Sequence, residues 1–194
     1  ILLRDSLVGK LGDKARVEED GVYAWVPTLT SVSRQSIFAG AEPLFFATSL
    51  GNTSKEKGLW TRFWEDRGAK KVEIGYVKEG KGQSDEAFLK NVSEIAEHPK
   101  MRVLGIVVGK IDQAMHGVNT GSSGLHAIVR EWAKSGAFSR LIESLLDKNY
   151  EIVITADHGN IHGHGIGKPQ VGVVADERGE RAHVFSDELT REGV

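Results

Sequence analysis

The largely apolar segment at residues 101–108 constrains the fold of this chain more than any other feature. It contains the β-branched residues Val103, Ile106, Val107 and Val108 and does not alternate between polar and apolar side chains. Short runs of this kind are typical of strands buried on both faces, as in a parallel sheet. The run is far shorter than the roughly 20 residues that a membrane-spanning helix needs. We therefore expect a globular fold with no membrane segment.

The rest of the chain alternates between helical and extended patterns. Amphipathic spacing and helix-end signals predict helices at residues 1–14, 31–38, 54–66, 84–98 and 125–148, the last broken at Ser135-Gly136. Apolar patterns predict strands at residues 22–25, 71–77, 101–108, 151–155, 171–174 and 182–185. Strands that alternate with helices favour an α/β fold with helices on both faces of a mostly parallel sheet.

Composition excludes several classes of protein. The 194 residues suit one large domain, and 27 acidic against 25 basic residues give a net charge of −2. A chain so close to neutral is no general binder of polyanions, so any contact with nucleic acid must be local. There is no cysteine, which excludes thiolate-bound metals and is typical of a reducing compartment such as the cytoplasm. The first residue is Ile1 rather than Met, so we expect an excised fragment.

Two of the predicted strands run into an acid and a histidine. Asp112 and His116 follow the strand at 101–108, and Asp157 and His158 follow the strand at 151–155. Sites in parallel sheets collect at the carboxyl ends of strands, and carboxylate and imidazole groups suit zinc or manganese. Each pair also has an ordinary interpretation, as a turn cap or a solvated pair on a helix. Their recurrence at two strand ends favours a metal site.

Three later histidines are candidates for a further ligand. His162 and His164 follow His158 at a spacing typical of metal ligands, although a flexible polar loop would have the same composition. His183 lies in one of the later predicted strands.

A hydroxyl-rich segment marks the start of the predicted helix at 31–38. Thr30, Ser31 and Ser33 are followed by Arg34. The N–H groups at a helix start bind anions, and an arginine can form a fork with phosphate oxygens. Thr30 is positioned where a nucleophile could be held. The alternative interpretation is an ordinary helix cap.

Together these segments resemble the PglZ domain of the alkaline phosphatase superfamily. Residues 27–40 are similar to the PglZ nucleophile segment and to the Pro-x-x-Thr…Gly segment of the superfamily's nucleotide pyrophosphatase/phosphodiesterase branch. Residues 155–160, Thr-Ala-Asp-His-Gly-Asn, match the superfamily's metal motif. Residues 53–64 and 179–182 are similar to further PglZ segments, so the resemblance spans nearly the whole chain.

The resemblance implies a three-layer α/β sandwich with a mostly parallel central sheet, and a hydrolase that uses two divalent metal ions, zinc or manganese. Thr30 would be the nucleophile, and the phosphoryl group would lie over residues 31–33 with Ser33 or Arg34 on its oxygens. The metal beside Thr30 would be held by Asp157 and His158, and the other by Asp112 and His116. A late histidine would be a further ligand, with His183 as first choice and His162 and His164 as close rivals.

The superfamily also has an early strand that ends in an Asp ligand, and no such strand precedes Thr30 here. We expect one PglZ-like domain over residues 1–194 that is truncated at its N-terminus and lacks its first strand. The metal site beside Thr30 would then be incomplete, which leaves open whether this fragment is active.

The implied substrate is a phosphodiester such as a nucleotide or nucleic acid, and the implied setting is a cytoplasmic phage-defence (BREX) or signalling protein. Thr rather than Ser at position 30 favours diesters, with a phosphomonoesterase or phosphomutase as the alternative. A third hypothesis is a non-catalytic module that other defence or signalling proteins dock onto. The aromatic residues for such a surface are Trp60, Phe63, Trp64 and Trp132. The helical spacing of Trp60, Phe63 and Trp64 is more typical of a core.

Overall fold

A computed structural model describes residues 2–26, 28–42, 52–117, 121–159 and 188–192 of the chain. Its elements in chain order are α1 (Leu2–Leu11), α2 (Thr30–Ala39), α3 (Glu56–Glu65), β1 (Ile74–Lys78), α4 (Asp85–Ala96), β2 (Val103–Val107), α5 (Lys110–Gly117), α6 (Gly121–Ser135), α7 (Ala137–Leu146) and α8 (Glu188–Glu192). Short 3-10 turns follow α1 at Gly12–Lys14 and precede β1 at Lys71–Glu73. The chain is therefore of mixed α/β class.

The two strands form a parallel pair connected through α4. Ile74 lies opposite Val103, and the register continues to Lys78 opposite Val107. Parallel strands need such a crossover, which a helix usually supplies. The strand predicted at 101–108 and its parallel pairing are confirmed. The strand predicted at 71–77 begins only at Ile74, because residues 71–73 form the 3-10 turn.

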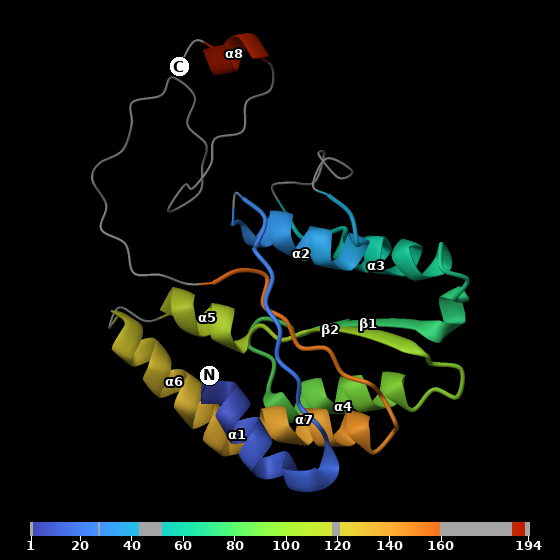
Figure 1. The fold of residues 1–194 in the computed structure, drawn as a ribbon, viewed down its shortest axis with the longest axis vertical. Helices are drawn as coiled ribbons and strands as arrows, with labels where there is room; N and C mark the ends of the chain where they lie inside the picture. The colour runs from blue at the N-terminus through green and yellow to red at the C-terminus, as the bar shows by residue number, and fades with distance from the viewer. Residues whose placement is uncertain (1, 27, 43–51, 118–120, 160–187, 193–194) are drawn as a thin grey trace.

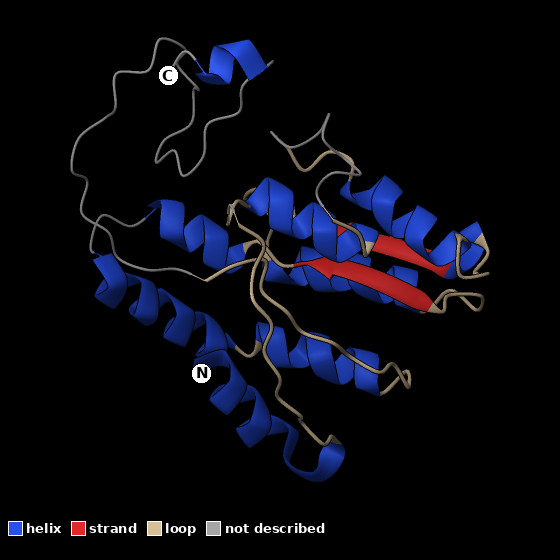
Figure 2. Cartoon of the chain, turned by 45° about the horizontal axis from the view of Figure 1, so that its top comes forward, coloured by secondary structure: helices blue, strands red, loops and turns tan. Residues whose placement is uncertain are grey.

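Helices cover both faces of this sheet (Figures 1 and 2): α2 and α3 lie on one face, α4 and α7 on the other. On the side of α4 and α7, the core consists of Val77, Phe88, Val92, Ala96, Leu141 and Leu145. On the opposite side, the Phe38 ring lies 5.4 Å from that of Tyr76 and 5.6 Å from that of Trp60, and Trp60 Nε1 donates to the Gly75 carbonyl at 2.8 Å. Trp60 is thus a core residue.

Several helix ends follow the expected signals. The Ser84 hydroxyl caps α4 by accepting from the Ala87 N–H at 3.2 Å, and α2 ends at Gly40, whose φ is +57°. Gly136, with φ +77°, separates α6 from α7 at the predicted break. The helix predicted from residue 54 begins at Glu56, and the Ser54 hydroxyl donates to the Asn52 side chain rather than capping the helix.

Two predicted strands are absent. Residues 22–25 and 151–155 have no strand pairing among the described residues. Tyr23 is fully exposed and Val153 is 86% exposed, whereas Ile152 is partly buried against the core. An apolar pattern does not make a strand without a neighbour to supply hydrogen bonds, and neither segment is paired with β2. The strands expected at 171–174 and 182–185 lie outside the described residues. No described helix has the length and apolar character needed to span a membrane.

Candidate active site

The start of α2 leaves the Thr30 hydroxyl available for chemistry. Leu29 occupies the N-cap position and makes no side-chain cap, while its carbonyl accepts from the N–H groups of Val32 and Ser33 at 3.1 and 2.9 Å. The hydroxyl-rich segment therefore does not serve as an ordinary side-chain cap. Thr30 is the first residue of the helix and lies at the end where the helix dipole is positive.

The Thr30 hydroxyl meets His158, which lies 128 residues later in the chain. Thr30 Oγ1 and His158 Nε2 are 3.1 Å apart. On the other side of the ring, His158 Nδ1 lies 2.8 Å from the Gly159 carbonyl oxygen. A carbonyl only accepts, so Nδ1 carries the hydrogen and Nε2 has a lone pair that accepts from the Thr30 hydroxyl. The His158 side chain is 8% exposed, so this contact is shielded from water.

Asp157 joins the same cluster. Its Oδ1 accepts from the His158 N–H at 3.1 Å, and its Oδ2 lies 3.7 Å from His158 Nε2. Two ligands of one tetrahedral ion, each about 2.0–2.1 Å from it, stand about 3.3 Å apart. The spacings of Oδ2 and Thr30 Oγ1 from Nε2 are close to that value. The Nδ1–H bond to Gly159 is also the outer contact that metal-binding histidines commonly make. Asp157 Oδ2 and His158 Nε2 are thus spaced as two ligands of one divalent cation could be.

Arg34 is bound to a buried carboxylate. Its Nη2 donates to Glu56 Oε2 at 2.7 Å, and the same oxygen accepts from the Tyr76 hydroxyl at 2.7 Å. Lys78 Nζ lies 3.6 Å from it. Burial, together with the bond to Glu56, raises the pKa of Tyr76, so the phenol remains a donor. Sequence reasoning missed Glu56: it lies in a segment that resembles PglZ, but an acid at a helix start is ordinary.

The structure places three of the remaining predicted site residues: Ser31, Ser33 and Asp112. Ser33 is buried, and its hydroxyl has no hydrogen-bond partner among the described residues; Ser31 accepts a hydrogen bond from Gln35 through its carbonyl. Asp112 lies on α5 and is exposed. His116 is on the same helix, but its side chain is not among those that the structure describes. His162, His164 and His183 lie outside the described residues. Within the described ranges, no three acids or histidines come close enough to hold a metal.

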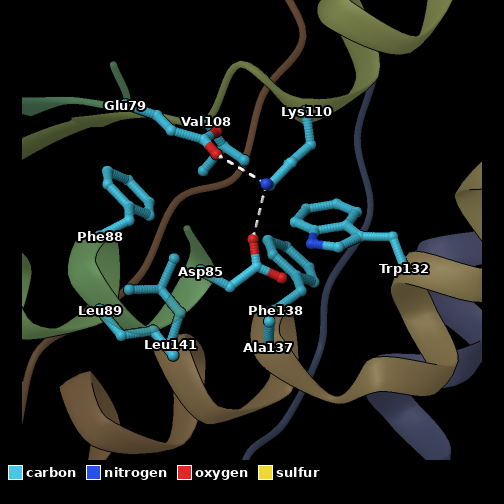
Figure 3. Close-up of a pocket in the computed structure, with 10 residues that line it drawn as sticks. All are labelled: Glu79, Asp85, Phe88, Leu89, Val108, Lys110, Trp132, Ala137, Phe138 and Leu141. Carbon is cyan, nitrogen blue, oxygen red and sulfur yellow. Dashed lines mark ion pairs between the residues drawn. The ribbon is translucent and has the colours of Figure 1, made fainter. Parts of the chain in front are cut away.

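A small cavity lies at the end of the sheet, beside α4, α6 and α7 (Figure 3). Its volume is about 10 Å³, which is room for about one water molecule. Lys110 Nζ lies inside it, 2.8 Å from Asp85 Oδ1 and 3.3 Å from Glu79 Oε1. Its other lining residues are Phe88, Leu89, Val108, Trp132, Ala137, Phe138 and Leu141. It is too small for a substrate and does not include the Thr30 cluster.

Comparison with known families gives first the class of protein and then the family. The chain carries an alkaline phosphatase-like domain, in agreement with its α/β fold and with a threonine that faces an Asp-His pair. The family model that matches residues 3–190 is that of the BREX system PglZ alkaline phosphatase-like domain, and the chain belongs to this family. No curated protein and no solved structure matches the chain.

Proposed function

We propose that this domain is a metal-dependent phosphodiesterase with Thr30 as its nucleophile. The contact of Thr30 Oγ1 with His158 Nε2 at 3.1 Å carries the proposal. This contact joins the hydroxyl of the segment at residues 27–40 to the imidazole of the motif at residues 155–160. Asp157 and His158 would hold one divalent cation, zinc or manganese, and Asp112 and His116 would hold the second, with one of the later histidines as a further ligand.

The chain's own residues supply most of the chemistry. A cation bound by Asp157 and His158 would supply the Lewis acidity that favours loss of the Thr30 proton. Thr30 Oγ1 then forms a bond to phosphorus while the bond to the leaving alcohol breaks. Water cleaves the resulting threonine phosphoester and regenerates the hydroxyl. The positive end of the α2 dipole favours the phosphoryl charge throughout, and Ser33 and Arg34 are the proposed partners of its oxygens.

The proposed architecture is the three-layer sandwich of the superfamily over residues 1–194, with β1 and β2 as part of a larger, mostly parallel sheet. The helices on both faces of the two described strands support it. Membership in a BREX family supports a role in phage defence, with other defence or signalling proteins as partners and the cytoplasm as location. Nucleotides or nucleic acid are the proposed diester substrates.

The test compares bis(p-nitrophenyl) phosphate with p-nitrophenyl phosphate, in Mn²⁺ or Zn²⁺ and in EDTA. We expect metal-dependent turnover that is faster on the diester and is lost in Asp157→Asn. Faster turnover of the monoester would instead indicate a phosphomonoesterase. If the chain binds the cation but turns over neither ester, the enzymatic proposal fails and the docking-module hypothesis replaces it.

A further inference from the structure

The Glu56 carboxylate, beside the candidate active site, is contacted by hydrogen-bond donors from two other elements. Its side chain is 1% exposed, and it lies at the start of α3. Arg34 reaches it from α2, and Tyr76 and Lys78 reach it from β1. A buried carboxylate is costly unless its charge is matched, so this arrangement fixes the Arg34 guanidinium in one position.

Arg34 lies four residues after Thr30 on α2, so the two side chains share one face of the helix. Among the described residues, one terminal nitrogen of its guanidinium contacts Glu56, the group also interacts with the Tyr76 hydroxyl, and its side chain is 15% exposed. Its Nε has no hydrogen-bond partner among the described residues. A guanidinium has five N–H donors, so capacity remains for an oxyanion near Thr30.

Holding Arg34 in advance matters for anion binding. A long side chain loses rotamer freedom when it binds a ligand, and a side chain that is already fixed loses less. The Glu56 carboxylate also matches the guanidinium charge while no anion is bound. Substitution of Glu56 would therefore weaken anion binding without removing any group that touches the anion.

We propose that Glu56 is a positioning residue that holds Arg34 for an oxygen of the phosphoryl group at Thr30. The inference rests on the proposed function, because it takes Thr30 as the site of the phosphoryl group. Glu56 itself contacts no substrate atom.

A double-mutant cycle tests this coupling in the full chain with Mn²⁺ present. The four proteins are wild type, Glu56→Gln, Arg34→Ala and the double variant, each titrated with inorganic phosphate by calorimetry. We expect Glu56→Gln to raise the phosphate Kd about ten-fold, because Arg34 then loses the charge-assisted contact that holds it in position. In the Arg34→Ala background, the same substitution should change Kd by less than about two-fold. With a diester substrate, KM should rise more than kcat falls.

Glu79→Gln is the matched control. The Glu79 side chain is equally buried and also paired with a lysine, but it contacts Gly109 and Lys110 rather than Arg34. The Glu79→Gln variant should have a lower Tm than the wild type and the same phosphate Kd. Glu56→Asp is the second variant in case Glu56→Gln does not fold: it keeps the charge and withdraws the carboxylate from Arg34, so it should raise Kd similarly.

Two results would overturn the inference: no phosphate binding by the wild type, or a Kd change from Glu56 substitution that persists in Arg34→Ala. The outcome is separable from the proposed function. If Glu56 and Arg34 are coupled in phosphate binding but no diester is turned over, the phosphodiesterase proposal fails and the positioning role of Glu56 stands. If diesters are turned over but the two residues are not coupled, the phosphodiesterase proposal stands and the positioning role fails.

Discussion

At the scale of single residues, the tautomer of His158 determines what the Thr30 cluster can do. Because the Gly159 carbonyl accepts a hydrogen bond from Nδ1–H, the Nε2 lone pair faces Thr30 Oγ1. A cation ligand and a hydroxyl partner both need that lone pair. If Nε2 carried the hydrogen instead, it could neither accept from Thr30 nor bind a cation, although the distances would be the same.

We predict that His158→Ala lowers diester turnover at least about 100-fold and weakens Mn²⁺ binding, since loss even of an outer metal contact costs 10–100-fold. Steady-state kinetics and calorimetry measure the two effects. His126→Ala, on an exposed position of α6, is the control and should match the wild type in both. Unchanged Mn²⁺ affinity in His158→Ala would remove His158 from the proposed ligand set.

At the scale of elements, the close contact between α2 and α3 depends on Gly40. Its φ is +57°, and a Cβ there would overlap Cε2 of Phe63 on α3. We predict that Gly40→Ala lowers the free energy of unfolding by about 2–4 kcal/mol, from left-handed strain and overpacking together. Gly68→Ala is the matched control, because Gly68 also has a positive φ but nothing within 4 Å of its Cβ position. Denaturant unfolding should show a smaller loss for Gly68→Ala, and equal losses would contradict the steric account.

The start of α5 is held by Lys110. Its hydrogen bond to Asp85, and the charges of Asp85 and Glu79, raise the pKa of Lys110 above its ordinary 10.5, against the effect of burial. The folded state therefore binds this proton more tightly than the unfolded state. The stabilisation is fully present below pH 10.5 and is lost as the pH rises through the higher folded value.

We therefore predict that the stability difference between wild type and Lys110→Met shrinks above pH 10.5. Urea unfolding at pH 8, 10 and 11.5 measures it. Taking the difference between the two proteins removes the contribution of Tyr76 and Tyr150, whose pKa values are also raised. A difference that stays constant to pH 11.5 would contradict the role given to Lys110.

The elements also show what sequence reasoning could and could not reach. Helices such as α4 and the pair α6 and α7 were predictable, because amphipathic spacing, the Ser84 cap and Gly136 are local signals. The segments 22–25 and 151–155 were mispredicted, because a strand depends on partners elsewhere in the chain. Thr30 and His158 were predictable only as motifs. Glu56 was missed because its partners lie about 20 residues away in either direction.

At the scale of the whole molecule, the sheet separates two packed layers, and the aromatic residues of α3 belong to one of them. Trp60 lies against Phe38 and donates to the Gly75 carbonyl on β1. We predict that Trp60→Ala lowers the free energy of unfolding by about 3–5 kcal/mol, the usual loss for a large core side chain. Trp25→Ala, at a half-exposed position, is the control and should cost far less. Equal stability of the two variants would favour the docking-surface hypothesis for the α3 aromatic residues.

The fold also brings two distant segments of the chain together at the Thr30 cluster. The Thr30 hydroxyl comes from the start of α2 and His158 from the segment that follows α7, so folding alone brings them within 3.1 Å. An interaction module would have no need of this convergence. A phosphoryl-transfer site requires it, since the nucleophile must adjoin the groups that activate it.

The measurement that tests this claim most directly is the initial rate of Mn²⁺-dependent diester hydrolysis by wild type, Thr30→Ser and Thr30→Ala. We predict measurable turnover for wild type and Thr30→Ser, and a loss of at least about 1,000-fold for Thr30→Ala, because only the first two can form the covalent ester. Thr30→Ala at the wild-type rate, with its Tm unchanged, would contradict the assignment of Thr30 as the nucleophile.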